Sequence, residues 1–503
     1  MIKNEKFDLT ILILVSLLLT IYLFSRTYVI SLDGVSQYIP MAKVFASGFF
    51  KDAVRFTGQQ PLYSFLIALL SRLVPDFEIA GKLISSFFGI MVIFPVYFLG
   101  KRIFDRKVAF LSVFLLVIHP YVRRFSADVL KESLYLFLLA ASIWFSLRTF
   151  EKEKIYPYIF IPFLSAMAYL IRPDGVEILL VVFFYILFVK KFSAPGRKWV
   201  VILFLLLASC VLLFPYLFHL REIAGEWTLS KAKSIVGILG WGVTKGEISL
   251  ITKVIYSLKK LNLEIFAIYH PLFIFLLALG LLRKIFFHFK NEEKFLIFFF
   301  VLHYLVLFLM IFNLTEWRSG EKVQEYMVSG RHVLPLLIIS IYWVGEGFFT
   351  VYQWIFKKIE SGNLLHHLES KKKSTIVFVA LLVLLLIIVL PKTLKPQRYE
   401  RLPEKWAGIW IKSQSGKGMI IFTTAPRVAY YADGNFEYIN FNKDKFDQIK
   451  VSMAEKKALY LAIRGREVAN LPQNTEAVKS DLVELGRFEG KGMEKIIVYK
   501  LGR

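Results

Sequence analysis

The sequence has a single cysteine, Cys210, and it lies within an apolar run. One cysteine can form neither an intrachain disulfide nor a thiolate metal cluster, so redox chemistry is disfavoured. The histidines show no HExxH or other paired-ligand spacing, and the chain has no Walker-type or GxGxxG loop. Zinc-hydrolase chemistry and binding of a soluble nucleotide therefore have no support. No cofactor is predicted, and a requirement for a divalent metal is left open.

Acidic residues are scarce, with 38 Asp and Glu against 63 Lys and Arg, for a net charge of +25. In a soluble protein this excess would suggest nucleic acid, but 56% of the residues are hydrophobic and the mean hydropathy is +0.57. That is too apolar for an ordinary soluble protein. The basic residues cluster in short loops between apolar runs, as the positive-inside rule requires. The chain is predicted to be a polytopic α-helical membrane protein that contacts membrane lipids and no nucleic acid.

Apolar segments long enough to cross a bilayer recur along most of the chain. Reading spans of roughly twenty residues predicts about eleven of them. They lie near residues 8–27, 79–100, 107–120, 127–148, 155–171, 175–190, 198–220, 264–284, 295–312, 332–356 and 374–391. The pair His119-Pro120 predicts a helix stop after the third span.

The first span has no small-residue cleavage site after it, which predicts a retained anchor rather than a signal peptide. If the N-terminus is cytoplasmic, every loop assigned inside is basic. An odd number of spans then places the C-terminus outside. We expect a multi-pass protein of the cell (inner) membrane with its functional face outside, which groups the following residues there: Asp33, Asp128, Glu132, Arg172, Arg318 and Arg331.

The composition changes after the last predicted span, near Lys392 to Pro396, to that of a small globular domain. Lys405 to Ser413 is predicted to be a helix, and the predicted strands are Met419 to Thr424, Lys457 to Arg464 and Ile496 to Lys500. The expected organisation is a transmembrane domain over 1–391, with a first outer loop at 28–78, and an extracytoplasmic α/β domain over 392–503.

The first outer loop carries Asp33 at the foot of the first span. The residues after it place apolar side chains at three- and four-residue spacing, which predicts a helix lying in the membrane interface: Val35, Tyr38, Ile39, Ala42, Phe45, Ala46 and Phe49. Asp33 has two readings. It could cap this helix, contributing about 1 kcal/mol, or act as a general base at the lipid–water boundary. A second interfacial helix is predicted from Pro61 to Leu73, because about thirteen residues rise only about 20 Å.

Other charged residues stand at the outer ends of later spans. Asp128 and Glu132 share one helix face, and Arg123 and Arg124 precede them, either to pair with them or to bind an anion. Arg172 comes before Pro173, which is suited to open a helix whose N-terminus favours phosphate. A snorkelling role at the lipid headgroups is the alternative for Arg172.

The segment from Ser329 to Pro335 adds Arg331 at the same depth. Arginine can bind phosphate oxygens in bidentate fashion. Arg331 is therefore a second candidate for an anion site on the outer face.

These motifs in this order resemble the GT-C superfamily of integral-membrane glycosyltransferases, and most nearly the branch of protein O-mannosyltransferases and aminoarabinose (lipid A) transferases. The matching segments are LDGVSQYIPMAKVFASG, GQQPLYSFLIALLSRLV, FSADVLKESLYLFLLA, YLIRPDG, SGRHVLPLL, KWAGIWIKSQ and VAYYADG. The resemblance implies a glycosyltransferase that takes a sugar from a polyprenyl-phosphate donor and passes it to a lipid, polysaccharide or protein acceptor. It also implies that the configuration at the anomeric carbon is inverted.

The resemblance also implies roles for individual residues. Asp33 would be the general base, with Glu132 or Asp128 as second acidic residue. The donor-phosphate candidates are Arg172, Arg331, Arg123 and Arg124, and the candidate substrate contacts are Tyr38, Gln60, Tyr63 and His332. Two departures stand out, since many relatives have Asp-Glu at Asp33-Gly34 and a basic residue before Pro61. The second acid and one phosphate ligand would then come from elsewhere in the chain.

Two other functions fit the same sequence. A transporter or flippase of lipid-linked saccharides would also place charges inside a membrane protein, although the paired inverted repeats typical of transporters are not evident in the sequence. A non-catalytic partner of a polysaccharide assembly system is the third possibility.

Overall fold

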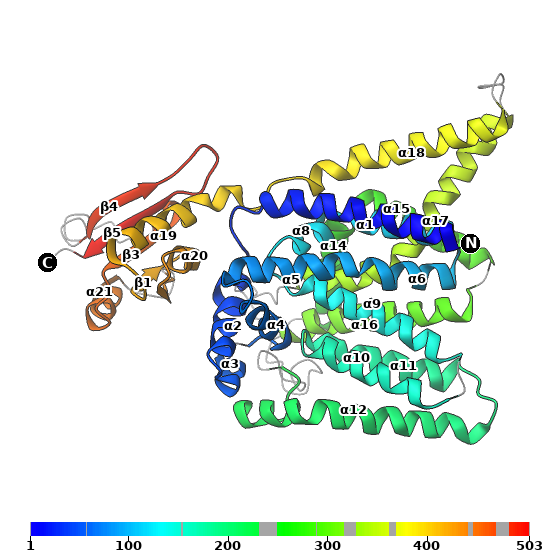
Figure 1. The fold of residues 1–503 in the computed structure, drawn as a ribbon, viewed down its shortest axis with the longest axis horizontal. Coiled ribbons are helices and arrows are strands. Elements are labelled where there is room, and N and C mark those ends of the chain that lie inside the picture. The colour runs from blue at the N-terminus through cyan, green and yellow to red at the C-terminus, as the bar shows by residue number, and fades with distance from the viewer. Residues whose placement is uncertain are drawn as a thin grey trace.

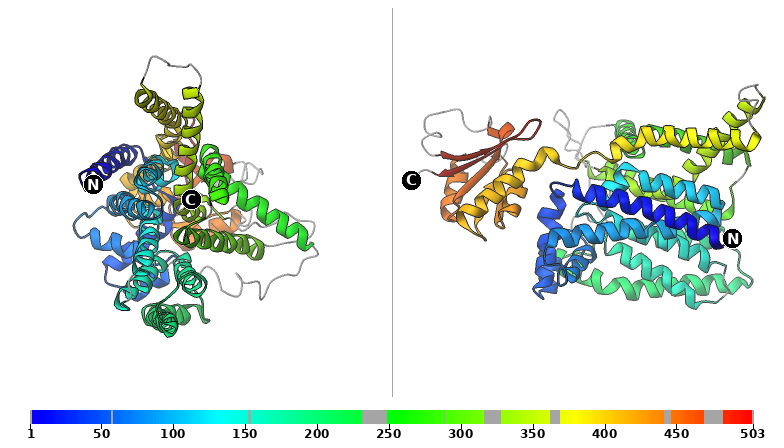
Figure 2. Two further views of the ribbon diagram at one scale, coloured as in Figure 1. Left: turned by 90° about the vertical axis from the view of Figure 1, so that its right-hand side faces the viewer. Right: turned by 45° about the horizontal axis from the view of Figure 1, so that its top comes forward.

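The computed structural model describes residues 2–56, 58–151, 154–230, 249–287, 289–315, 328–361, 369–440, 446–468 and 482–501. Long helices lie side by side in a bundle, and a small sheet domain lies beyond one end of it (Figures 1 and 2). The bundle helices are α1 (Ile2–Ser25), α5 (Phe77–Met91), α6 (Ile93–Ile103), α7 (Arg106–Ile118), α8 (Pro120–Ser126), α9 (Glu132–Thr149), α10 (Phe160–Tyr169), α11 (Glu177–Phe188), α12 (Pro195–Ala224), α14 (Leu250–Tyr269), α15 (Pro271–Phe287), α16 (Asn291–Leu314), α17 (Gly330–Ser361) and α18 (Ser370–Thr393).

Each predicted span falls on helical structure, but the span count stays a prediction. By length and composition, the described residues contain six helices able to cross a membrane, or up to eight if each bent pair is one span. Helix α10 has 10 residues and α11 has 12. At 1.5 Å per residue they rise only about 15–18 Å, short of a hydrocarbon core of roughly 30 Å. Short 3-10 turns, η2 (Tyr156–Ile159) and η3 (Pro173–Val176), precede them.

Two breaks in the helices bear on the predicted boundaries. The predicted stop at His119-Pro120 is confirmed, since α7 and α8 meet there at 62°. The predicted span 264–284 is wrong as a single segment, because the chain turns by 103° between α14 and α15. His270, with φ of 71°, and Pro271 make that turn. Helix α14 is amphipathic, and its lysines interrupt the apolar run, so the start of this helix was not recognised in the sequence.

Helix α17 runs through the core of the bundle and is buried over most of its length. Helix α15 packs so closely against it that a Cβ on Gly347 would lie 1.8 Å from the Leu276 carbonyl oxygen, and a Cβ on Gly280 would lie 1.9 Å from that of Trp343. Small residues allow helix backbones to approach in this way inside membranes. This packing fixes α17, and with it the depth of Arg331 in its first turn.

Three short helices, α2 (Ile39–Ala46), α3 (Phe50–Phe56) and α4 (Leu62–Leu70), cross one end of the bundle rather than running along it (Figure 1). Both predicted loop helices are therefore present. The apolar stripe before α3 is buried as far as Phe45, whereas Phe49 lies beyond the end of α2 and is exposed. On α4 the leucine-rich face is the exposed one, and Tyr63, Ser64, Ile67 and Ala68 face the protein. A lipid surface, not the protein core, would cover that apolar face.

The chain after α18 forms a five-stranded sheet in the order β2-β1-β3-β5-β4. The strands are β1 (Ile420–Thr423), β2 (Asn435–Tyr438), β3 (Tyr460–Arg464), β4 (Leu482–Phe488) and β5 (Ile496–Leu501). The first three are parallel, and β5 is antiparallel to β3 and β4. The accompanying helices are η4 (Tyr399–Arg401), α19 (Leu402–Ser415), α20 (Pro426–Tyr431), α21 (Phe446–Glu455) and α22 (Gly465–Val468). A small α/β domain was predicted here, but β2 and β4 are short or exposed and were not recognised in the sequence.

Candidate active site

A cavity of about 400 Å³ lies at the end of the bundle that α2 to α4 cross. Its lining joins segments that are far apart in the sequence: the loop before α2, the loop before α4, the starts of α9, η3 and α17, and the sides of α11 and α16. The lining residues that the sequence analysis singled out are Asp33, Tyr38, Gln60, Glu132, Arg172, Arg331 and His332. Folding therefore brings most of the predicted site residues to one place. Arg318 lies outside the described residues.

Asp33 does not act as a helix cap. Its backbone is already helical, with φ −63° and ψ −35°, and its side chain accepts no capping hydrogen bond. It begins a π-helical turn, η1 (Gly34–Tyr38), of a kind often found at functional sites. Its Oδ2 instead accepts a hydrogen bond from Arg331 Nη1. The capping interpretation of Asp33 is wrong, and the carboxylate faces the cavity.

Arg331 stands between the acidic residues of the cavity. Its Nη1 contacts Asp33 Oδ2 and lies 3.8 Å from Glu132 Oε1. The side chains of Arg331 and Asp33 are 31% and 21% exposed, whereas Glu132 is 3% exposed. One guanidinium therefore offsets part of the repulsion between the two carboxylates.

Some polar atoms in the cavity wall are buried and unpaired within the described part of the chain. They are Glu132 Oε2, Tyr38 Oη and Glu177 Oε1. Buried polar atoms without a partner carry a desolvation cost of about 1–3 kcal/mol each. A ligand rich in hydroxyl groups would remove that cost by hydrogen bonding to them.

Lys131 brings a further cation to the cavity and was missed in the sequence. Its Nζ donates a hydrogen bond of 2.6 Å to Gln59 Oε1 and lies 5.8 Å from the centre of the Tyr38 ring. Residues 58–60, before Pro61, contain no basic residue, but a lysine from the start of α9 reaches Gln59 there.

Arg172 is buried and already engaged by the protein. It donates to Asp174 Oδ2, donates to the Arg331 carbonyl oxygen over 2.8 Å, and lies 4.8 Å from the centre of the Tyr135 ring. Pro173 opens η3 as the sequence predicted. Arg172 therefore holds the backbone at the start of α17, and Arg331 is the more accessible of the two arginines.

Part of the cavity lining is apolar. Leu180 of α11 and Val306 and Met310 of α16 form it together with Val176 and Leu229. Glu177, at the start of α11, bonds to His303 Nδ1 over 2.7 Å, and His303 Nε2 bonds to the His332 carbonyl oxygen over 2.8 Å. This pair ties α11 and α16 to the start of α17. A lone histidine in an apolar helix gave no sign of it in the sequence.

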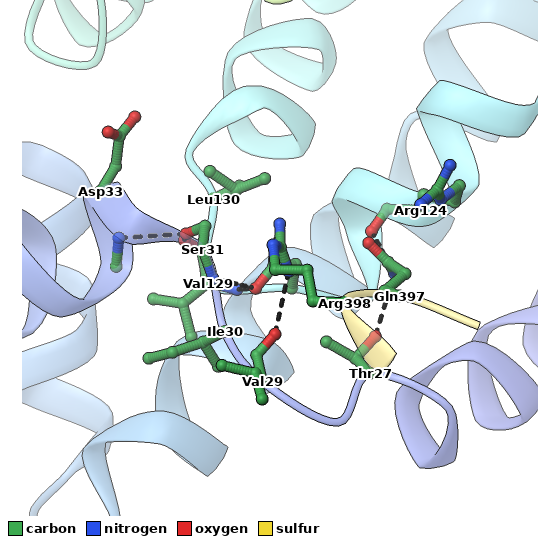
Figure 3. A network of polar contacts seen from close by, with 12 residues as sticks. Thr27, Val29, Ile30, Ser31, Asp33, Arg124, Val129, Leu130, Gln397 and Arg398 are labelled. Carbon is green, nitrogen blue, oxygen red and sulfur yellow. Dashed lines mark hydrogen bonds and ion pairs between the residues drawn. The ribbon is translucent and has the colours of Figure 1, made fainter. Parts of the chain in front are cut away.

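Four predicted site residues do not line the cavity. Arg123 is fully buried and donates to Ser16 Oγ over 2.6 Å and to the Gly89 carbonyl over 2.5 Å, so it joins α8 to α1 and α5. Arg124 lies on the same helix, and its carbonyl accepts a hydrogen bond from Gln397 (Figure 3).

The other two outlying residues are Asp128 and Tyr63. Asp128 is fully buried and pairs with Arg398 at 2.5 Å. The Tyr63 hydroxyl lies 2.7 Å from Ser85 Oγ, beneath α4. Neither Asp128 nor Glu132 pairs with Arg123 in the described contacts, and only Glu132 of the two acids reaches the cavity.

Gly34, which follows Asp33, is closely packed. A Cβ at this position would lie 3.0 Å from Val129 Cβ and 3.0 Å from Ser31 Oγ. A side chain at position 34 would therefore require Val129 or Ser31 to shift by a few tenths of an ångström. The second acid that Arg331 contacts beside Asp33 is Glu132.

Within the described residues, no group of three or more His, Cys, Asp and Glu side chains is arranged to hold a metal ion. Arg331 contacts Asp33 and Glu132, Arg172 contacts Asp174, and His303 contacts Glu177, so each acid of the cavity has a basic side chain beside it. The arrangement is suited to an anion and a proton acceptor side by side.

Comparisons with known proteins bear on the fold of the chain. Residues 58–214 match the family described as dolichyl-phosphate-mannose-protein mannosyltransferase. A comparison with curated protein sequences found no match. The fold is similar to that of ArnT from Cupriavidus metallidurans bound to undecaprenyl phosphate, with a TM-score of 0.61, 11% identity and coverage of 97% of each chain.

It is also similar to AglB, the oligosaccharyltransferase of Archaeoglobus fulgidus, in complex with an inhibitory peptide and a dolichol-phosphate. The TM-score is 0.60 at 10% identity, and the match covers 99% of this chain and 74% of AglB. The resemblance that the motifs indicated is confirmed. The chain has the membrane fold of the GT-C glycosyltransferases.

Proposed function

We propose that the chain is a glycosyltransferase that moves a sugar from a polyprenyl-phosphate donor to an acceptor on the outer face of the membrane. The observation that carries this proposal is the cavity itself. It places a carboxylate, Asp33, beside two accessible cations, Arg331 and Lys131, and gives them an apolar wall on α11 and α16. A donor with a sugar, a phosphate and an isoprenoid chain needs these three surfaces together.

In the proposed reaction, Asp33 accepts a proton from the acceptor hydroxyl or amine as that atom attacks the anomeric carbon. The bond between the anomeric carbon and the phosphate oxygen breaks, and the electron pair leaves with the polyprenyl phosphate. Attack opposite the leaving group inverts the configuration of the sugar. Arg331 and Lys131 stabilise the charge on the departing phosphate, and charge-assisted hydrogen bonds are suited to this role.

The buried, unpaired atoms Glu132 Oε2 and Tyr38 Oη are proposed to bind sugar hydroxyls. The bundle end that carries the cavity is proposed to face outside, with the N-terminus in the cytoplasm and residues 392–503 as an extracytoplasmic domain. A reporter fused after Arg503 tests this topology. Activity of a reporter that works only in the cytoplasm would overturn it.

The experiment that tests the function uses the purified chain in liposomes with a radiolabelled polyprenyl-phosphate sugar and envelope fractions containing lipid, polysaccharide or protein acceptors. Transfer of the label into one fraction by the parent, with loss of transfer in Asp33→Asn, supports the proposal. Asp52→Asn, an exposed carboxylate on α3, is the matched control. Movement of the labelled lipid between leaflets without any transfer would instead indicate a flippase.

A further inference from the structure

The segment from Arg26 to Ser31, here called the strap, joins α1 to Asp33 (Figure 3). Its first half is held by Gln397, which follows α18. Gln397 N donates to the Arg26 carbonyl over 3.0 Å, and its carbonyl accepts from Tyr28 N over 3.3 Å. Gln397 Nε2 also donates to Thr27 Oγ1 over 2.9 Å. The strap is thus paired with the C-terminal part of the chain like a short strand.

The second half of the strap is held by the sheet domain. Ile30 N donates to the Tyr431 hydroxyl over 3.3 Å, and the Ile30 carbonyl accepts from Arg427 Nε over 2.9 Å. Arg427 is itself fixed by a 3.0 Å ion pair with the buried Glu404. Both contacts come from α20. They connect the sheet domain directly to the approach to Asp33.

Arg398 joins the middle of the strap to the bundle. Its Nη1 donates to the Val29 carbonyl over 3.0 Å, and its Nη2 donates to Asp128 Oδ2 over 2.5 Å. The other oxygen of Asp128 accepts from Ser31 N over 3.1 Å. Arg398 has a φ of 51°, in the left-handed region that residues other than glycine rarely adopt. The surrounding contacts hold it in that conformation.

Ser31 connects the Arg398–Asp128 pair to the residues around Asp33. Its hydroxyl donates to the Val129 carbonyl over 2.8 Å and accepts from Gly34 N over 3.0 Å. The chain of contacts therefore runs from Arg398 through Asp128 and Ser31 to the first turn of η1. Asp33 lies between Ser31 and Gly34, so its backbone is fixed on both sides.

We propose that Arg398 and Asp128 are a positioning pair for Asp33, and that the sheet domain contributes to catalysis through this pair and the strap. The inference rests on the proposed role of Asp33 as the base. Neither residue lines the cavity, so neither touches the substrate. A displacement of about 1 Å at a reacting group can lower a rate about 10²-fold, which makes a fixed strap consequential.

The experiment compares Arg398→Gln, Arg398→Lys and Arg106→Gln in the full chain. Arg106 forms a comparable pair with Asp8, 2.6 Å from Nε to Oδ2, which joins α7 to α1 away from the strap. Hydrogen–deuterium exchange of residues 27–34 is measured without any substrate. Relative to the parent, we expect exchange to be faster in Arg398→Gln, to increase less in Arg398→Lys, and to be unchanged in Arg106→Gln. Unchanged exchange in Arg398→Gln would overturn the inference whatever the function.

Kinetics then separate positioning from general stability. We expect kcat of Arg398→Gln to fall about tenfold or more while KM for the donor is unchanged, and Arg398→Lys to recover part of the rate. Adding Arg398→Gln to Asp33→Asn should cause no further loss, because the pair acts only through Asp33. Additive losses, or parent-like kcat with faster exchange, would refute positioning. If the parent shows no transferase activity but exchange is faster in Arg398→Gln, the proposed function is refuted. The structural role of Arg398 in holding the strap is then still supported.

Discussion

Replacing Asp33 with Asn tests the proposed chemistry most directly. The substitution keeps the size of the side chain, and an Asn oxygen can still accept the hydrogen bond from Arg331. It removes only the charge and the basicity of the carboxylate. Since the Asp33 side chain makes no capping hydrogen bond, no cap is lost.

The effects on stability and on rate differ enough to be told apart. The Asp33–Arg331 pair is 21% and 31% exposed, so solvent screens it and its loss lowers the free energy of unfolding by about 1 kcal/mol or less. A general base contributes about 10²- to 10⁴-fold in rate, which corresponds to about 3–5 kcal/mol of activation free energy. The rate should therefore collapse while the fold persists.

The assay measures kcat for sugar transfer, donor affinity and melting temperature on the same preparation. We expect a loss of kcat of at least about 10²-fold, a nearly unchanged melting temperature and retained donor binding. Asp33→Glu should keep a trace of activity. Parent-like turnover by Asp33→Asn would refute the role of Asp33 as base and make Glu132 the next candidate.

Arg331→Gln should weaken donor binding about tenfold or more, because a charge-assisted hydrogen bond contributes about 1.5–3 kcal/mol. Arg55→Gln, at an exposed position, should leave donor binding unchanged. Equal donor affinities of the two variants in a titration would contradict this. Lys131→Gln should weaken donor binding while Lys131→Arg retains it, because only the first substitution removes a cation from the cavity lining. Equal donor affinities of the two variants would contradict a role for this charge. Gly34→Glu should lower the melting temperature, because its Cβ meets Val129 at 3.0 Å, and Val129→Ala should restore part of the loss.

The amino-acid sequence by itself determined the class of the protein. Apolar runs separated by basic loops specify a helical membrane protein, because each span must satisfy its backbone hydrogen bonds internally. The same local patterns predicted the short helices α2 and α4 and the change in composition before the sheet domain. The motifs around Asp33, Pro61, Glu132, Arg172 and Arg331 indicated the GT-C fold, although they are scattered along the chain.

Only the tertiary structure decided which charges meet. Asp128 and Glu132 stand one helical turn apart in the sequence, yet the non-helical turn before α9 directs Glu132 into the cavity and leaves Asp128 with Arg398. Lys131 was not singled out in the sequence, and only the fold places it beside Gln59. Such pairings depend on distances between segments that lie far apart in the chain, and local periodicity carries no information about them. For the same reason, the sequence could not show that residues after α18 hold the strap leading to Asp33.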